Sequence, residues 1–192
     1  MKQLRQYIRR ILLTEAMKSV ADLPDDTVVV INATDTFAAI YYGDIEDPQQ
    51  QTDLYGEIQI YAPSDSYYGN CGNAWMVGGV AAKHGWGPLL YDVAIEWATQ
   101  NAGGLISDRG SVSDAAQGVW NYYMRNRDEV TAHQLDDLKN SLTPEEEDNC
   151  SQDIGRSTVT GMYDTWQDSA LSKRYTKPPT TMQALGKKLV IL

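Results

Sequence analysis

The chain is poor in cysteine and in basic side chains, and it has no long apolar run. Two cysteines, Cys71 and Cys150, among 192 residues are too few for a disulfide framework or a four-thiolate zinc site. This sparse use suits a reducing compartment, and a single bridge between the two stays open. No stretch approaches the roughly 18 apolar residues that a membrane helix needs, so we expect no membrane partner.

Basic side chains are outnumbered, with 16 Lys and Arg against 26 Asp and Glu, for a formal net charge of −10. Because nucleic-acid binding depends on basic side chains that neutralise phosphates, we expect no nucleic-acid partner. The charge is uneven, since both ends are basic and residues 128–153 hold nine acids and one lysine. Such runs are most simply solvated faces.

The length favours one domain with a sizeable core, and 42% apolar residues with 22% charged residues are ordinary for a globular protein. We expect a single domain over residues 19–192, with an acidic insertion near residues 128–153. Residues 1–18 stand apart as a basic amphipathic helix or leader, because Leu4, Tyr7, Ile8, Ile11 and Leu12 form one helical stripe between arginines.

Alternating strands and helices are predicted along the domain. Runs at residues 27–31, 37–42 and 58–61, bounded by turn residues, predict three antiparallel strands, and residues 74–82 predict a central strand. A helix follows with Pro88 in its first turn, and Gly103-Gly104 ends it. Its apolar face predicts packing on the sheet, with Asp92 and Glu96 pointing away to solvent.

Beyond that helix, residues 105–107 predict a short strand, and Ser113 caps a helix that carries Trp120 and Tyr123 on one face. Residues 128–160 predict helix fragments and loop. Residues 172–177 predict a late strand, and residues 181–192 a terminal helix. We therefore expect an α/β (α+β) fold, with a mixed, mainly antiparallel sheet flanked by helices.

The clearest chemical signal is the glycine turn that joins the central strand to the helix. A first helical turn presents backbone N–H groups without internal partners, and side-chain-free residues let a phosphate approach the backbone. Lys83 and His84 can add positive charge beside Gly85 and Gly87. The turn lacks the ending of a Walker loop and the third glycine of the dinucleotide fingerprint, so a tight turn without a ligand is the simpler alternative.

The order of strand, Gly85-x-Gly87 turn, helix, short strand and a helix opening at residues 112–116 resembles the core of the GNAT acetyltransferase superfamily. This resemblance covers about residues 74–127, and the looser strand order extends it to about residue 27. It implies that the turn grips the pyrophosphate of acetyl-CoA. The residues that it implies for cofactor binding are Val80, Ala82, Lys83, His84, Gly85, Trp86, Gly87 and Ser113.

Two positions depart from the family pattern. Ala82 stands where the family has Arg or Gln, and Trp120 stands where many members have the tyrosine that protonates the leaving thiolate. Because an indole cannot act as a general acid, Tyr123 and Tyr122 are the candidate catalytic residues. The resemblance implies acetyl-CoA as cosubstrate and no metal. The acceptor is a small-molecule or peptide amine, and the acidic surface favours a cationic one. Glu57, Asp65 and Asp108 are conceivable bases.

A second resemblance concerns the N-terminus. Leu13-Thr14-Glu15-Ala16 resembles the site that prohead proteases of tailed phages cut, and the peptide before it resembles a capsid-targeting leader. The segment from residues 85–92 through Asp108-Arg109 and Val112-Ser113 also resembles phage-encoded GNAT members. Together they imply the host cytoplasm or packaging in the virion, with capsid components and a prohead protease as partners. A helix packed on the domain and a transit-like presequence are the alternatives.

Two other classes of function remain open. The stretch Asn70-Cys71-Gly72-Asn73-Ala74-Trp75 is similar to the Cys-Gly-Ser-Cys-Trp stretch of papain-like proteases, which makes Cys71 a candidate nucleophile with His84 or His133. The other class is a catalytically inactive GNAT-like protein, structural or packaged in a phage capsid. Ala82 and Trp120 favour this class.

Overall fold

The computed structural model describes residues 17–50, 55–63, 67–157 and 165–192. Within these ranges the main sheet has eight strands in the order β10-β1-β2-β3-β4-β5-β9-β6. The strands are β1 (Thr27–Ala33), β2 (Phe37–Asp44), β3 (Gly56–Tyr61), β4 (Trp75–Ala82), β5 (Leu105–Ile106), β6 (Thr131–Gln134), β9 (Lys173–Thr176) and β10 (Leu189–Ile191). The predicted α+β fold with a mixed, mainly antiparallel sheet is confirmed.

The first four strands form an antiparallel meander, as predicted. From β4 the chain passes through α2 (Gly87–Asn101) to β5, which lies parallel to β4. A parallel pair needs such a crossover, which a helix supplies. Strand β9 then lies between β5 and β6, antiparallel to both.

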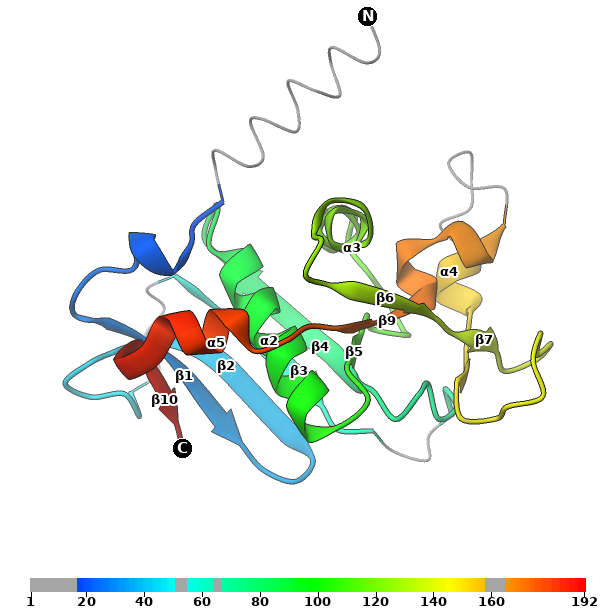
Figure 1. Ribbon diagram of the computed structural model, residues 1–192, viewed down its shortest axis with the longest axis horizontal. Helices are drawn as coiled ribbons and strands as arrows, with labels where there is room; N and C mark the ends of the chain where they lie inside the picture. Colours follow the sequence, from blue (N-terminus) through cyan, green and yellow to red (C-terminus); the bar gives the residue numbers. More distant parts are fainter. Residues whose placement is uncertain (1–16, 51–54, 64–66, 158–164) are drawn as a thin grey trace, which may run out of the picture.

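Helices cover one face of this sheet, where the largest apolar cluster lies. Helix α2 packs on strands β2 to β5 and on β9, and α5 (Thr180–Leu185) lies across α2 (Figure 1). Helix α3 (Asp114–Asn126) stands beside the N-terminal half of α2 and above β6 and β9 (Figure 1). Short 3-10 turns occur at η1 (Val20–Asp22), η2 (Trp166–Asp168), η3 (Ala170–Ser172) and η4 (Gly186–Lys188).

This second layer overturns the expected orientation of two acids on α2. Asp92 is only 7% exposed and Glu96 is fully buried, because α3 and α5 cover the side of α2 that faces away from the sheet. Glu96 accepts hydrogen bonds from the backbone N–H groups of Thr181 and Met182, both at 2.7 Å, and pairs with the ammonium of Lys177. An acid at the start of α5 is favourable because the first N–H groups of a helix have no internal partners.

The predicted terminal helix is wrong beyond Leu185. Gly186 adopts φ of 52° and ends α5, and residues 189–191 then form β10 parallel to β1. The β-branched pair Val190-Ile191 favours this strand. The tail therefore completes the sheet.

The acidic segment contains more strand than predicted. Residues 131–134 form β6, and β7 (Asp136–Asp137) pairs with β8 (Asn149–Cys150) before α4 (Asp153–Ser157). A Cys71–Cys150 disulfide ties β8 to the turn before β4. The structure thus has the single bridge that the sequence left open.

In the part of the chain that the structure describes, no helix is both long and apolar enough to span a membrane.

Candidate functional site

The turn between β4 and α2 places the glycine motif at the start of a 15-residue helix. Lys83 and His84 are exposed. Gly85 has φ of 84°, a left-handed conformation that favours glycine. The Trp86 N–H donates to the Lys83 carbonyl oxygen at 3.0 Å and closes the turn. Within the described residues no side-chain hydrogen bond caps the start of α2, which leaves its first N–H groups without a side-chain partner there.

Trp86 has a different role from the one expected for a ligand-binding side chain. Its indole is 7% exposed, and it lies 4.4 Å from the Tyr55 ring and 5.3 Å from the Tyr42 ring, between centroids. The Tyr42 hydroxyl donates to the Trp86 carbonyl oxygen at 2.8 Å. Burial, with the nearby Asp92 carboxylate, raises the pKa of Tyr42 well above its usual value, so this hydroxyl stays a donor. The Trp86 side chain therefore anchors the turn to the core, and only its backbone faces the site.

Strands β4 and β5 separate soon after they meet. They pair only at Trp75–Leu105 and Met76–Ile106, and among the described residues the rest of β4 pairs on one side only, with β3. Val80 lies opposite the buried Ile58 and therefore on the helix-covered face, yet it is 37% exposed. The C-terminal half of β4 thus offers a free backbone edge that leads into the Gly85 turn.

An irregularity in β4 lies where this separation begins. The register between β3 and β4 shifts between Gln59 and Ile60, so that Gly78 is the extra residue of a β-bulge. Gly79 follows, and a Cβ built on it would meet nothing within 4 Å. Ala82 is exposed at the other end, and a Cβ on Gly87 would lie 3.7 Å from the Ala82 Cβ. Small residues therefore line the strand from the bulge to the turn.

Tyr123, the first candidate catalytic residue, is buried beneath the first turns of α2. It is 1% exposed, and its hydroxyl lies 2.8 Å from Asp92 Oδ1 and 3.0 Å from the Pro88 carbonyl oxygen. Arg127 donates to Asp92 Oδ2 at 2.9 Å and also pairs with Glu129. Burial, reinforced by the Asp92 charge, raises the pKa of Tyr123 well above its usual value. In this arrangement Tyr123 joins α3 to α2.

The same network perturbs Asp92. Burial raises the pKa of its carboxyl, although Arg127 and Tyr123 partly offset the shift. For Arg127, burial alone would lower the pKa, but the charges of Asp92 and Tyr123 and the contact with Glu129 raise it on balance. The guanidinium therefore stays charged while the carboxylate carries a desolvation penalty.

Replacing Asp92 by Asn should change how stability depends on pH. Between the usual value of 3.8 and the raised pKa, the folded state binds more protons at Asp92 than the unfolded state. The contribution of this carboxyl to stability therefore falls as pH rises through that window. Urea unfolding of wild type and Asp92→Asn at matched pH values should show the difference in unfolding free energy moving in favour of the variant as pH rises. A constant difference would contradict the raised pKa.

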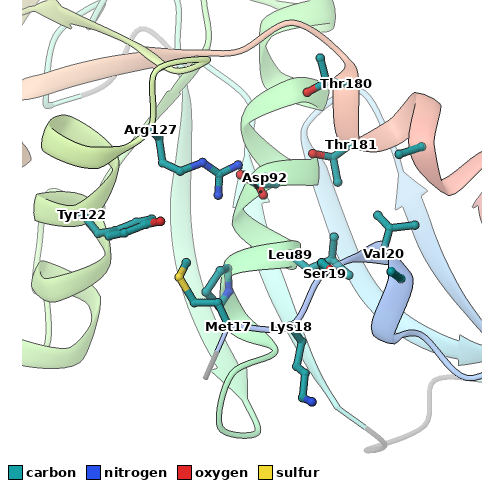
Figure 2. Close-up of a pocket in the computed structure, with 13 residues that line it drawn as sticks. Met17, Lys18, Ser19, Val20, Leu89, Asp92, Tyr122, Arg127, Thr180 and Thr181 are labelled. Atoms are coloured by element: carbon teal, nitrogen blue, oxygen red, sulfur yellow. Dashed lines mark hydrogen bonds and ion pairs between the residues drawn. The ribbon is translucent and has the colours of Figure 1, made fainter. Parts of the chain in front are cut away.

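Tyr122 lines a cavity of about 450 Å³ beside the glycine turn. Figure 2 shows Tyr122 projecting from α3 toward α2, with Met17 between Tyr122 and the helix. Arg127, just past the end of α3, reaches Asp92 on α2 directly. Residues 17–21 form one wall, and the Lys18 N–H donates to the Gly85 carbonyl oxygen at 2.9 Å. The full lining is Met17, Lys18, Ser19, Val20, Ala21, Pro88, Leu89, Asp92, Tyr122, Arg127, Thr180, Thr181 and Ala184.

Helix α3 confirms one prediction and explains one departure. Ser113 is the N-cap of α3, and its hydroxyl oxygen accepts a hydrogen bond from the Ala116 N–H at 3.3 Å. Trp120 is 1% exposed, with its ring stacked 4.9 Å from that of Tyr175, between centroids. An indole in this position fills the core and has no access to a ligand.

The predicted residues fall into two groups. Val80, Ala82 and residues 83–87 follow one another along the end of β4 and the turn, and Tyr122 lines a cavity that begins at Pro88. Ser113 caps α3 at its exposed start, whereas Tyr123 and the Trp86 ring are buried.

The conceivable bases are also separated. Asp108 accepts a hydrogen bond from the Gly110 N–H at 2.6 Å, whereas Glu57 lies opposite Ala81 on the face of the sheet away from α2. Asp65 lies outside the described residues. Residues 1–16, the greater part of the proposed leader, also lie outside them.

Sequence reasoning did not find Asp92, Arg127 or the wall formed by residues 17–21. Asp92 lies on the polar stripe of an amphipathic helix, where the pattern predicts solvent. The available signal was Arg127, a basic residue just past the end of α3 that can compensate a buried acid.

The disulfide removes the cysteine hydrolase alternative. A cysteine nucleophile acts as a thiolate, and the Cys71 sulfur is bonded to that of Cys150. Cys71 and Cys150 are 3% and 0% exposed, which fits a structural bridge.

No group of three or more His, Cys, Asp or Glu side chains in the described ranges is arranged to hold a metal ion. No protein-family model, curated protein or solved structure matches the chain significantly. The fold and site define an α+β protein with a splayed central strand that leads through a glycine turn into a helix.

Proposed function

We propose that this chain is an N-acetyltransferase of the GNAT type, which moves an acetyl group from acetyl-CoA to a primary amine. The supporting observation is the splayed half of β4, whose free edge leads directly into the Gly85 turn and the start of α2. A ligand with an amide-bearing arm and a pyrophosphate end suits such a surface. The arm can pair with a free strand edge, and the pyrophosphate can accept from N–H groups at a helix start.

The residues around the turn fit the anionic end of this ligand. Lys83 and His84 are exposed beside Gly85, and α2 has no acidic residue in its first turn. The side-chain-free positions Gly85 and Gly87 let phosphate oxygens approach the backbone. Ala82 stands in place of the family's Arg or Gln and has no side-chain hydrogen-bond donor. The backbone N–H groups are therefore the main contact for the pyrophosphate.

The chemistry requires a neutral amine, a stabilised oxyanion and a protonated leaving group. N–H groups on the free edge of β4 can donate to the oxyanion of the tetrahedral intermediate. Tyr122 is the candidate acid for the departing thiolate, because its side chain lines the open cavity. Tyr123 is a positioning residue in this proposal, since its hydroxyl is held under α2 by Asp92 and Pro88.

Replacing Gly87 by Glu tests the cofactor site. A Cβ at Gly87 meets only the Ala82 Cβ at 3.7 Å, and an acid in the first turn of a helix is favourable for the fold. The new carboxylate should nevertheless repel the pyrophosphate and weaken acetyl-CoA binding at least tenfold. Calorimetric titration of acetyl-CoA into wild type and Gly87→Glu measures this change.

Gly118→Glu is the matched control for that experiment. Gly118 lies on α3 and a Cβ there meets nothing within 4 Å, so the same change in charge leaves the turn untouched. Binding by wild type and Gly118→Glu but not by Gly87→Glu supports the proposal. Absence of binding by wild type would contradict it.

A second candidate function is a GNAT-like protein without catalysis, structural or packaged in a phage capsid. Two observations favour it: Trp120 fills the core where the family has its acid, and the Tyr123 hydroxyl is enclosed. This candidate predicts no thioester turnover. The host cytoplasm or the virion as location, and capsid components or a prohead protease as partners, remain proposals that accompany the leader resemblance.

A further inference from the structure

The open face of β3 and β4 lies opposite α2, at the point where β4 and β5 separate. Side chains of directly paired residues share a face, so Tyr61, Gln59 and Glu57 lie on the face away from the buried Ile58 and Ile60. On β4, Gly79 and Ala81 pair with Gln59 and Glu57 and are exposed.

An aromatic pair stands at the start of the separation. The Tyr61 ring lies against Gly78, since a Cβ on Gly78 would fall within the space of that ring. Tyr61 is 43% exposed, and its ring centroid lies 5.4 Å from that of Phe37 on the neighbouring strand. Gly78 comes two residues after Met76, the last β4 residue paired with β5. An exposed aromatic surface therefore borders the opening between the two strands.

The Glu57 carboxylate lies on the same face of β3 as Tyr61, with Gln59 between them on that face. Glu57 is half-buried, and its Oε1 accepts a hydrogen bond from the Gln59 amide. Burial, together with the Glu57 charge, raises the pKa of the neighbouring Tyr41. Tyr41 is 3% exposed and its hydroxyl donates to the Pro48 carbonyl oxygen at 3.2 Å. The Gln59 contact holds the carboxylate on the sheet face that Gly79 and Ala81 share.

The opening between β4 and β5 gives this face access to a ligand on the β4 edge. On the other face, α2 packs against the strand. A second substrate that must reach the same edge therefore has its clearer approach over Gly79 and Ala81, beside the Tyr61 ring that covers Gly78.

We infer that the face formed by Phe37, Tyr61, Gln59 and Glu57 binds the acceptor, and that the acceptor is a primary amine with an aromatic or apolar body. The inference rests on the proposed acetyltransferase function. The apolar body lies against Tyr61 and Phe37, where aromatic surface is exposed. The ammonium pairs with the Glu57 carboxylate, whose single negative charge neutralises the positive charge of the amine.

The protons and electron pairs of the acetyl transfer balance in this arrangement. The ammonium gives one proton to Glu57, and the nitrogen lone pair forms the C–N bond with the thioester carbonyl carbon. The C–S bond breaks with its electron pair on sulfur, which takes the hydroxyl proton of Tyr122 as the thiol forms. The second nitrogen proton then restores the Tyr122 hydroxyl. The products are an N-substituted acetamide, CoA thiol and the proton held by Glu57, which leaves to solvent.

Binding of two amine probes to the CoA-loaded protein tests the inference without relying on turnover. Phenethylamine carries an aromatic body, and ethanolamine carries the same ammonium with a polar one. Calorimetry should show phenethylamine binding at least tenfold more tightly than ethanolamine. Tyr61→Ala should remove that preference, and Glu57→Gln should weaken both probes about tenfold. With acetyl-CoA, phenethylamine should also be acetylated faster than ethanolamine, and Tyr61→Ala should remove this difference.

Two matched controls keep the result interpretable. Tyr67 is 87% exposed and Glu145 is exposed in the acidic segment, so Tyr67→Ala and Glu145→Gln should leave both probes unchanged. Binding of acetyl-CoA by wild type, with equal or no affinity for the two amines, would overturn the inference and leave the proposed function standing. Failure of wild type to bind acetyl-CoA would overturn both.

Discussion

Loss of the Cys71–Cys150 disulfide should lower the free energy of unfolding by about 4 to 5 kcal/mol. The bridge joins residues 79 positions apart, and closing a loop of this length removes that order of conformational free energy from the unfolded chain. Urea unfolding with and without a reductant, and of the double variant Cys71→Ala/Cys150→Ala, measures the loss.

The loss of stability should be concentrated in the segments beside the bridge. Beside the bridge, the Cys71 N–H donates to the Asn149 carbonyl oxygen at 3.0 Å, and the Ser151 N–H donates to the Tyr68 carbonyl oxygen at 2.8 Å. Hydrogen exchange should therefore rise first in residues 136–153, before the meander of β1 to β4. An unfolding midpoint that a reductant does not move would contradict the structural role of the bridge.

Replacing Lys177 by Met should destabilise the fold by about 3 to 5 kcal/mol. Lys177 and Glu96 are 2% and 0% exposed, and removing one partner leaves the other as an uncompensated buried charge. The Lys177 ammonium also donates to the hydroxyl oxygens of Thr180 and Thr181, at 2.7 and 2.9 Å. The substitution thus removes the ammonium that bridges Glu96 on α2 and the threonine hydroxyls at the start of α5.

Two further variants separate this effect from a general cost of mutation. Lys187 is exposed, so Lys187→Met should change the unfolding free energy by less than about 0.5 kcal/mol. Adding Glu96→Gln to Lys177→Met should recover part of the loss, because the buried charge is gone. The amide oxygen still accepts from one of the two N–H groups that Glu96 binds through separate oxygens. A double variant less stable than Lys177→Met would contradict this account.

Local patterns predicted the elements that depend on local chemistry. The meander, the turn at Gly85, the helix that ends before Gly103 and the Ser113 cap all follow from β-branched runs, glycines and a capping hydroxyl, and each is confirmed. These features are set by neighbours in the sequence, so a single chain suffices to find them.

The errors occur where distant segments decide the outcome. Asp92 and Glu96 are buried because α3 and α5 cover them, and their compensating charges lie at residues 127 and 177. The strand at residues 189–191 forms because β1 offers it an edge. The separation of β4 from β5, which carries the candidate site, likewise depends on tertiary pairing. The predicted roles of Tyr122 and Tyr123 came from the family resemblance and from their places near Trp120 on the helix. Neither reveals that one hydroxyl is enclosed and that the other side chain lines a cavity.

The parallel pairing of β10 with β1 has a consequence for the order of folding. It joins residues 29–31 to residues 189–191, whereas β2, β3 and β4 each pair with a neighbour in sequence. Contacts between distant segments form late because loop closure must come first, and such contacts slow folding. Until β10 docks, the outer edge of β1 offers unpaired N–H and C=O groups to other chains. The refolding yield should therefore fall as protein concentration rises, with the outer edge of β1 as the site of association.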